Sequence, residues 1–107
     1  MNTLNLSTSV SPRVGALLTR ITETPDLDTA LWKVLAEYVD FKTQALRQQV
    51  RTFEQKWGMP FAEFAQCVET ETLGQDPYTY EVESDFWEWE AAETLLDHYV
   101  SLRPRWM

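Results

Sequence analysis

Between Asp76 and Leu96 the sequence interleaves acidic and aromatic side chains and contains no Lys or Arg. Alternating carboxylates can bind a metal ion, and a carboxylate pair can perform general acid–base catalysis if burial raises the pKa of one of them. The acidic residues of the central part are Glu81, Glu83, Asp85, Glu88, Glu90 and Glu93. The aromatic residues are Tyr78, Tyr80, Phe86, Trp87 and Trp89.

A metal site is not what this pattern predicts. Glu81, Glu83 and Asp85 alternate, but a metal site needs ligands that converge in three dimensions, and the sequence has no calcium-binding loop with its glycine. A solvated or partner-facing acidic surface explains the three carboxylates without a metal. We therefore predict no metal and no cofactor.

Acid–base catalysis has one set of candidates, because Glu90, Glu93 and Asp97 share a helical face close to His98, the only histidine. A di-iron helix would need Glu three residues before that histidine, where the sequence has Leu95. One histidine without a suitable Ser or Cys does not form a catalytic triad. We predict a non-enzymatic protein without catalytic residues, and an enzyme built on these four residues is the third hypothesis.

Cys67 is the only cysteine, so an intrachain disulfide is excluded and a reducing cytoplasm is the expected compartment. Its position on the helical face of Phe64 and Val68 predicts a small buried side chain rather than a nucleophile. Nothing resembling a signal peptide starts the sequence, and no apolar run approaches the ~20 residues that cross a bilayer.

The formal net charge of -8 opposes contact with nucleic-acid phosphates and membrane headgroups and favours contact with a basic protein. Large aromatic rings beside the carboxylates can anchor such a contact. We therefore predict a partner-binding surface formed by Tyr78, Tyr80, Glu81, Glu83, Trp87 and Glu88.

With 107 residues the chain has the length of one domain, and its apolar spacing predicts an all-α fold. Met1 to Val10 is expected to be a flexible arm, with a short extended strand as the alternative. Ser11 and Pro12 predict the start of a helix of about ten residues. We assign residues 1–24 to this arm and short helix and residues 25–107 to a helical domain.

A long helix is expected to start near Pro25, because no Gly or Pro follows until Gly58, and Asp26 and Asp28 are expected in its first turn. It would either continue for roughly 50 Å and pair with a second copy, or break around Asp40 to Thr43 into two helices of one bundle. Apolar residues at helical spacing predict the surface of a homodimer: Leu27, Leu31, Val34, Tyr38 and Phe41.

After Gly58 the pattern predicts a helix from Pro60 to Leu73 that ends at Gly74. A turn at Asp76 and Pro77 and a short extended segment from Tyr78 to Val82 should follow. Ser84 is the expected cap of the last helix. Within that helix, Trp89 is assigned to the core and Trp87 to a protein interface, because positions two apart point about 200° away from each other.

The run Lys56-Trp57-Gly58-Met59-Pro60-Phe61, followed by Phe64 and by an acidic segment with Asp85, Trp89 and Glu90, resembles a family of small prokaryotic antitoxin-like proteins, the TumA-like proteins. They are encoded beside a small ribonuclease-like toxin. The resemblance covers about Gln48 to Leu96 and departs from the family in its aromatic segment from Pro77 to Val82. It implies a protein that binds and neutralises a toxin-like partner.

Five basic residues could form ion pairs with the acidic helix inside a homodimer or, alternatively, bind nucleic acid. They are Arg47, Arg51, Lys56, Arg103 and Arg105. The charge balance favours the first interpretation. The leading hypothesis is thus an antitoxin-like protein that neutralises a basic protein partner. The alternative is a homo-oligomeric helical module with a structural or regulatory role.

Overall fold

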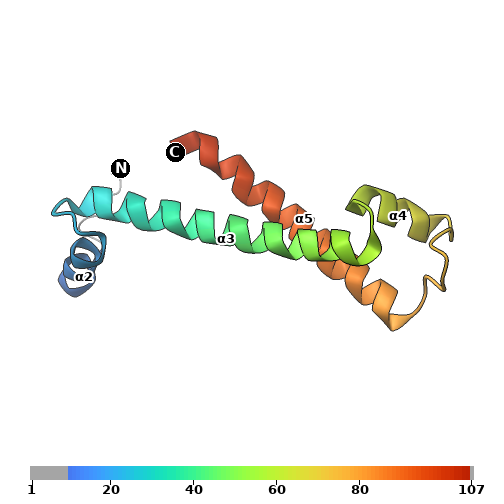
Figure 1. Ribbon diagram of the computed structural model, residues 1–107. Coiled ribbons are helices and arrows are strands. Elements are labelled where there is room, and N and C mark those ends of the chain that lie inside the picture. Colours follow the sequence, from blue (N-terminus) through green and yellow to red (C-terminus); the bar gives the residue numbers. More distant parts are fainter. Residues whose placement is uncertain (1–9, 107) are drawn as a thin grey trace, which may run out of the picture. The chain divides into compact units, whose positions relative to one another are not determined.

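The computed structural model describes residues 10–106, with side chains described as far as Arg103. Its elements are the helices α2 (Pro12–Thr22), α3 (Leu27–Trp57), α4 (Phe61–Glu69) and α5 (Tyr80–Trp106) (Figure 1). The described residues form no strand, which confirms the predicted all-α fold. The arm or strand expected at Met1 to Val10 lies, apart from Val10, outside the described residues.

The long helix is continuous, so the break considered around Asp40 to Thr43 is wrong. The chain nevertheless divides into two compact units, Met1–Asp40 and Phe41–Met107, whose boundary falls within α3. Each unit has its own internal packing.

Local capping explains the helix ends of the first unit. The Ser11 hydroxyl accepts the Val14 N–H at 3.2 Å, and Pro12 occupies the first turn of α2. Asp26 lies just before α3 rather than in its first turn, because its carboxylate caps the helix by accepting the Thr29 N–H at 3.0 Å. The side-chain hydrogen bond from Thr29 lowers the pKa of Asp26 below its usual value.

A left-handed glycine ends α3 as predicted. Gly58 has φ 72° and donates its N–H to the Glu54 carbonyl at 2.7 Å. The next helix, α4, ends at Glu69, so the expected end at Gly74 is wrong. Glu71 takes the left-handed conformation there, and the Thr72 N–H closes the helix on the Cys67 carbonyl at 2.9 Å.

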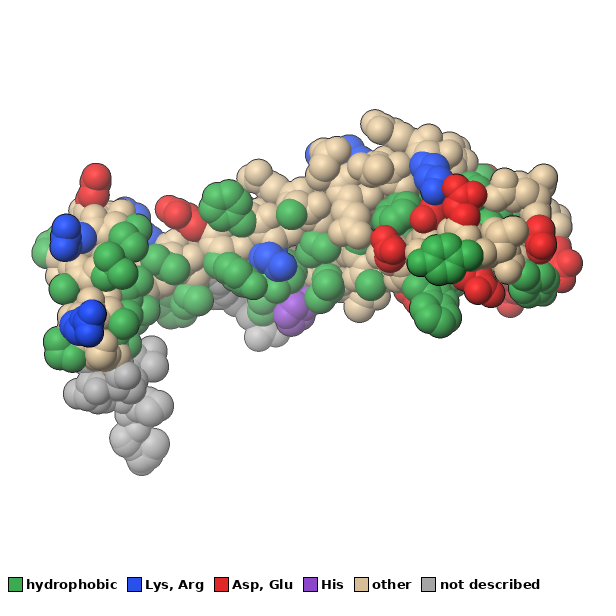
Figure 2. All heavy atoms as spheres, turned by 90° about the horizontal axis from the view of Figure 1, so that it is seen from below, with side chains coloured by type: hydrophobic (Ala, Val, Ile, Leu, Met, Phe, Trp, Pro, Cys, Tyr) green, Lys and Arg blue, Asp and Glu red, His purple; other side chains and the backbone are tan. Residues whose placement is uncertain are grey.

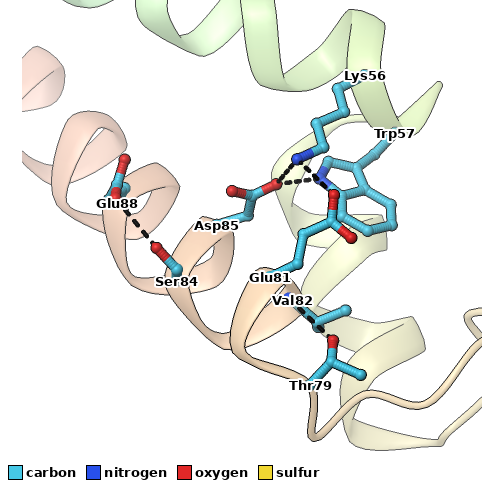
Figure 3. Close-up of polar contacts among 8 residues, drawn as sticks. All are labelled: Lys56, Trp57, Thr79, Glu81, Val82, Ser84, Asp85 and Glu88. Carbon is cyan, nitrogen blue, oxygen red and sulfur yellow. Dashed lines mark hydrogen bonds and ion pairs between the residues drawn. The ribbon is translucent and has the colours of Figure 1, made fainter.

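The helix α5 begins one turn earlier than expected, at Tyr80. Asp76 accepts the Tyr78 N–H at 3.0 Å and forms the expected turn, and the Thr79 hydroxyl then accepts the Val82 N–H at 3.3 Å as the helix cap (Figure 3). The expected extended segment from Tyr78 to Val82 is therefore wrong. Ser84 lies inside α5, where it cannot act as the cap.

Aromatic packing forms the core of the second unit, where α3, α4 and α5 meet. Trp89 and Phe64 are fully buried. The Trp89 ring stacks on Phe53 with centroids 5.4 Å apart and lies 5.0 Å from Phe64 and 5.3 Å from Phe61. Aliphatic residues from α3 and α5 complete this core: Leu46, Val50, Val82 and Ala92.

Replacing Trp89 with Ala should lower the free energy of unfolding by ~3–5 kcal/mol, because the cavity would lie among three aromatic rings. Chemical denaturation and thermal melting measure this loss. Trp87→Ala is the matched control, since it removes the same side chain from a position that is 73% exposed and should leave the melting temperature nearly unchanged. The reverse ranking would contradict the assignment of the two faces of α5.

Candidate functional site

The two tryptophans of α5 lie on opposite sides of the helix. Trp89 is fully buried, whereas Trp87 is 73% exposed. This confirms the expected placement of Trp89 in the core and of Trp87 at the surface. The interface role of Trp87 stays a prediction.

Exposed aromatic and acidic residues gather around Trp87. Tyr80, Glu83, Trp87 and Glu88 are exposed residues of α5 that follow helical spacing, and Tyr80 is 86% exposed. Tyr78, which is 68% exposed, precedes the helix. We call these five residues the acidic-aromatic surface. Figure 2 shows acidic and large apolar side chains side by side over this part of the second unit.

Two shallow hollows flank Trp87, and Glu83 lines both. One, of about 210 Å³, has mainly apolar walls formed by Val68, Pro77, Tyr78, Val82 and Phe86. The other, of about 260 Å³, is lined by Tyr80, Ser84 and Glu88 and combines a ring with two carboxylates. A partner that presents an apolar side chain next to a cation would fit this pair of hollows.

Hydrogen bonds within the chain orient part of this surface. Ser84 donates its hydroxyl to Glu88 at 3.1 Å (Figure 3). Tyr78 donates its phenol to Glu71 at 3.3 Å, and the negative charge of Glu71 raises the pKa of Tyr78 above its usual value. Tyr78 therefore remains a neutral phenol at physiological pH, and Glu71 extends the acidic character of the surface into the loop before α5.

Glu81, which was predicted to bind the partner, points to a different neighbour. The Lys56 Nζ lies 3.0 Å from Glu81 and 2.6 Å from Asp85, and Trp57 donates its indole N–H to Asp85 at 3.0 Å (Figure 3). We call these four residues the Lys56 cluster. The ion pair offsets the charge of Glu81, although 59% of that side chain remains exposed.

The Lys56 cluster joins the end of α3 to the start of α5. Hydrogen bonds to Asp85 and then to Glu81 raise the pKa of Lys56 above its usual value of 10.5, so Lys56 is charged at physiological pH. Lys56 was expected to pair with the acidic helix of a second copy in a homodimer. It pairs instead with Glu81 and Asp85 of its own chain. The sequence signal for this contact was a lysine at the end of one helix, followed by acidic residues at the start of a later helix.

The candidate catalytic residues lie along α5, most of them at its surface. Glu90, Asp97 and His98 are exposed, Glu93 is half-buried, and the His98 ring packs against Tyr99 with centroids 5.3 Å apart. Among the described residues, no group of three or more His, Cys, Asp or Glu side chains could hold a metal ion. Cys67, expected to be buried, is half-buried.

Most of the residues that carry the resemblance to antitoxin-like proteins have a structural role in the core or in a turn. Phe64 and Trp89 are core residues, Gly58 forms the turn after α3, and Lys56 and Asp85 belong to the Lys56 cluster. The surface that could meet a partner consists largely of other residues. The motif thus explains how α5 is positioned.

The predicted homodimer surface on α3 is only partly exposed. Leu27 and Leu31 are half-buried, and Leu27 lies against Gly15 of α2, where an added Cβ would be 3.8 Å from its methyl groups. Val34, Tyr38 and Phe41 are 37%, 52% and 73% exposed. The first turns of the stripe thus contribute to packing within the chain.

Comparisons with protein-family models, curated proteins and solved structures found no match to this chain. Among the described residues, no helix has the length and apolar character needed to cross a membrane.

Asp85→Ala should lower the free energy of unfolding by ~1–3 kcal/mol, because the substitution leaves the Trp57 N–H and the Lys56 charge without their main acceptor. Glu81→Ala is the control within the same cluster and should cost less than ~1 kcal/mol, because its ion pair is exposed to solvent. Urea denaturation of both variants measures the difference. Equal losses would contradict the dominant role of Asp85.

Proposed function

We propose that this protein is a non-enzymatic, antitoxin-like binding protein that neutralises a basic protein partner through its acidic-aromatic surface. The observation that carries the proposal is the exposure of Trp87, 73%, on a helix that buries Val82, Trp89 and Ala92 on its other side. An exposed tryptophan between two carboxylates has the composition of an interface hot spot for a cationic partner.

The charge of the molecule supports a basic partner. The chain carries 17 acidic and 9 basic residues, and the only lysine near the start of α5, Lys56, is engaged by Asp85 and Glu81. Near Trp87, Glu83 lines both hollows and Glu88 lines one of them. Such a field speeds association with a basic patch, while the rings around it slow dissociation.

The resemblance of the segment from Lys56 to Glu90 to antitoxin-like proteins supports a toxin-like partner, encoded by a neighbouring gene. The single cysteine fits a complex formed in the cytoplasm. In this proposal the motif residues hold α5 in place, and the exposed residues around Trp87 meet the partner.

Trp87→Ala should weaken binding of the basic gene neighbour by ~2 kcal/mol, or about 30-fold, without changing thermal stability. Co-expression, a sizing column and titration calorimetry provide the measurement. Tyr38→Ala is a suitable control, since it removes an exposed ring from α3. Absence of any complex between the unmodified chain and that neighbour would refute the proposed function.

A homo-oligomeric helical module is the second candidate. The observation that favours it is the exposure of Val34, Tyr38 and Phe41 at helical spacing on the continuous helix α3. Paired copies of this helix would remove the three side chains from water.

The double substitution of Val34 and Phe41 by Glu should convert such a homodimer to a folded monomer, because each dimer would place four carboxylates in an apolar seam. Sedimentation measures the mass, and circular dichroism checks folding. Arg47→Glu is the matched control, since it also makes the net charge more negative by two and is exposed on another side of α3, thirteen residues after Val34. An unchanged mass in the Val34 and Phe41 variant would contradict pairing through this stripe.

A further inference from the structure

The helix α2 has an apolar face that its own unit leaves open. None of its residues is buried, and Val14, Leu17 and Ile21 are 50%, 54% and 64% exposed. These positions recur at helical spacing and therefore lie on one side of the helix. An open hollow of about 580 Å³ runs along the same side and is lined in part by Arg13, Val14, Leu17 and Arg20.

The charge on α2 is the opposite of that on α5. The helix contains Arg13 and Arg20 and no acidic residue. Neither arginine takes part in an ion pair with another described residue. A short helix with two cations beside an apolar stripe is the chemistry that the acidic-aromatic surface can bind.

The spacing of the charges also matches. Arg13 and Arg20 are seven residues apart, as are the exposed Glu83 and Glu90. Seven residues correspond to about two helical turns, so each pair spans ~10 Å along one side of its helix. The exposed Trp87 lies between the two glutamates in sequence, as Leu17 lies between the two arginines.

From this complementarity we propose that α2 of one copy docks on the acidic-aromatic surface of a second copy and on the neighbouring Glu90. This contact rests on the proposed function, because it uses the same acidic-aromatic surface. When the basic partner is absent, α2 of a second copy binds there instead. Because the two docking surfaces differ, the contact is heterologous, and each added copy presents both surfaces again. Self-association and binding of a basic partner therefore exclude each other.

Two full-length variants test the contact by complementation. The first carries Arg13→Glu and Arg20→Glu, and the second carries Glu83→Arg and Glu90→Arg. Each variant alone should lose self-association, with an apparent dissociation constant raised at least about 10-fold, because like charges meet. An equimolar mixture should regain self-association, because the α2 of each variant then meets an α5 of opposite charge on the other variant.

One mixed contact joins the unaltered α2 of the second variant to the unaltered α5 of the first, and the other joins the two substituted surfaces, whose charges are exchanged. All chains carry Val34→Glu and Phe41→Glu, so that pairing through α3 does not contribute to the measured mass. Sedimentation velocity is recorded between about 0.01 M and about 1 M salt, across which the Debye length falls from ~30 Å to ~3 Å. The mixed assembly should dissociate as the salt concentration rises.

A chain that carries all four reversals is the matched control and should regain self-association, because its charges are exchanged between the two surfaces. A parent chain that stays monomeric, a mixture that stays monomeric, or either variant that still self-associates alone would overturn the proposal. Binding of the basic gene neighbour is a separate readout. The Arg13 and Arg20 variant retains its acidic-aromatic surface, so loss of the complex there would count against the proposed function and not against self-docking.

Discussion

The burial of Trp89 is the interaction on which the second unit depends. Its ring packs against Phe53, Phe61 and Phe64, so that α3, α4 and α5 share one aromatic cluster. Burying a ring of this size provides much of the apolar stabilisation in so small a core. It also determines the rotation of α5 about its axis, which leaves Trp87 on the outward side. Stability and surface chemistry are thus coupled through one helix.

The Lys56 cluster and the caps determine where α5 begins. Thr79 starts the helix before the acidic residues, and Asp85 then meets both Lys56 and the Trp57 indole. The carboxylates of Glu81 and Asp85, which lie close to the end of α3, are therefore paired within the chain. The exposed carboxylates left for a partner include Glu83 and Glu90, which lie seven residues apart on the side of α5 that carries Trp87, and Glu88, which follows Trp87 directly.

The two proposed contacts place different demands on the same chain. Recognition of a basic partner requires the rings and carboxylates around Trp87 to remain accessible. Self-docking requires the same surface to be covered by the basic helix α2 of a second copy, which has complementary charge and an apolar face. Competition between the two would set a concentration threshold for partner binding, because a ligand acts only through its preference for one state over the other. This threshold would depend on salt, since both contacts pair opposite charges.

Local sequence signals predicted the all-α fold, the start of α2 at Ser11, the long helix ending at Gly58 and the opposite placement of Trp87 and Trp89. They succeeded because helical spacing and capping act over a few residues. They failed at Glu71, which takes a left-handed conformation usually signalled by glycine, and at Thr79, which caps α5 before Ser84. Only the tertiary structure decided that Glu81 pairs with Lys56 and that Leu27 packs on Gly15, because these contacts join helices whose approach depends on how the whole core packs.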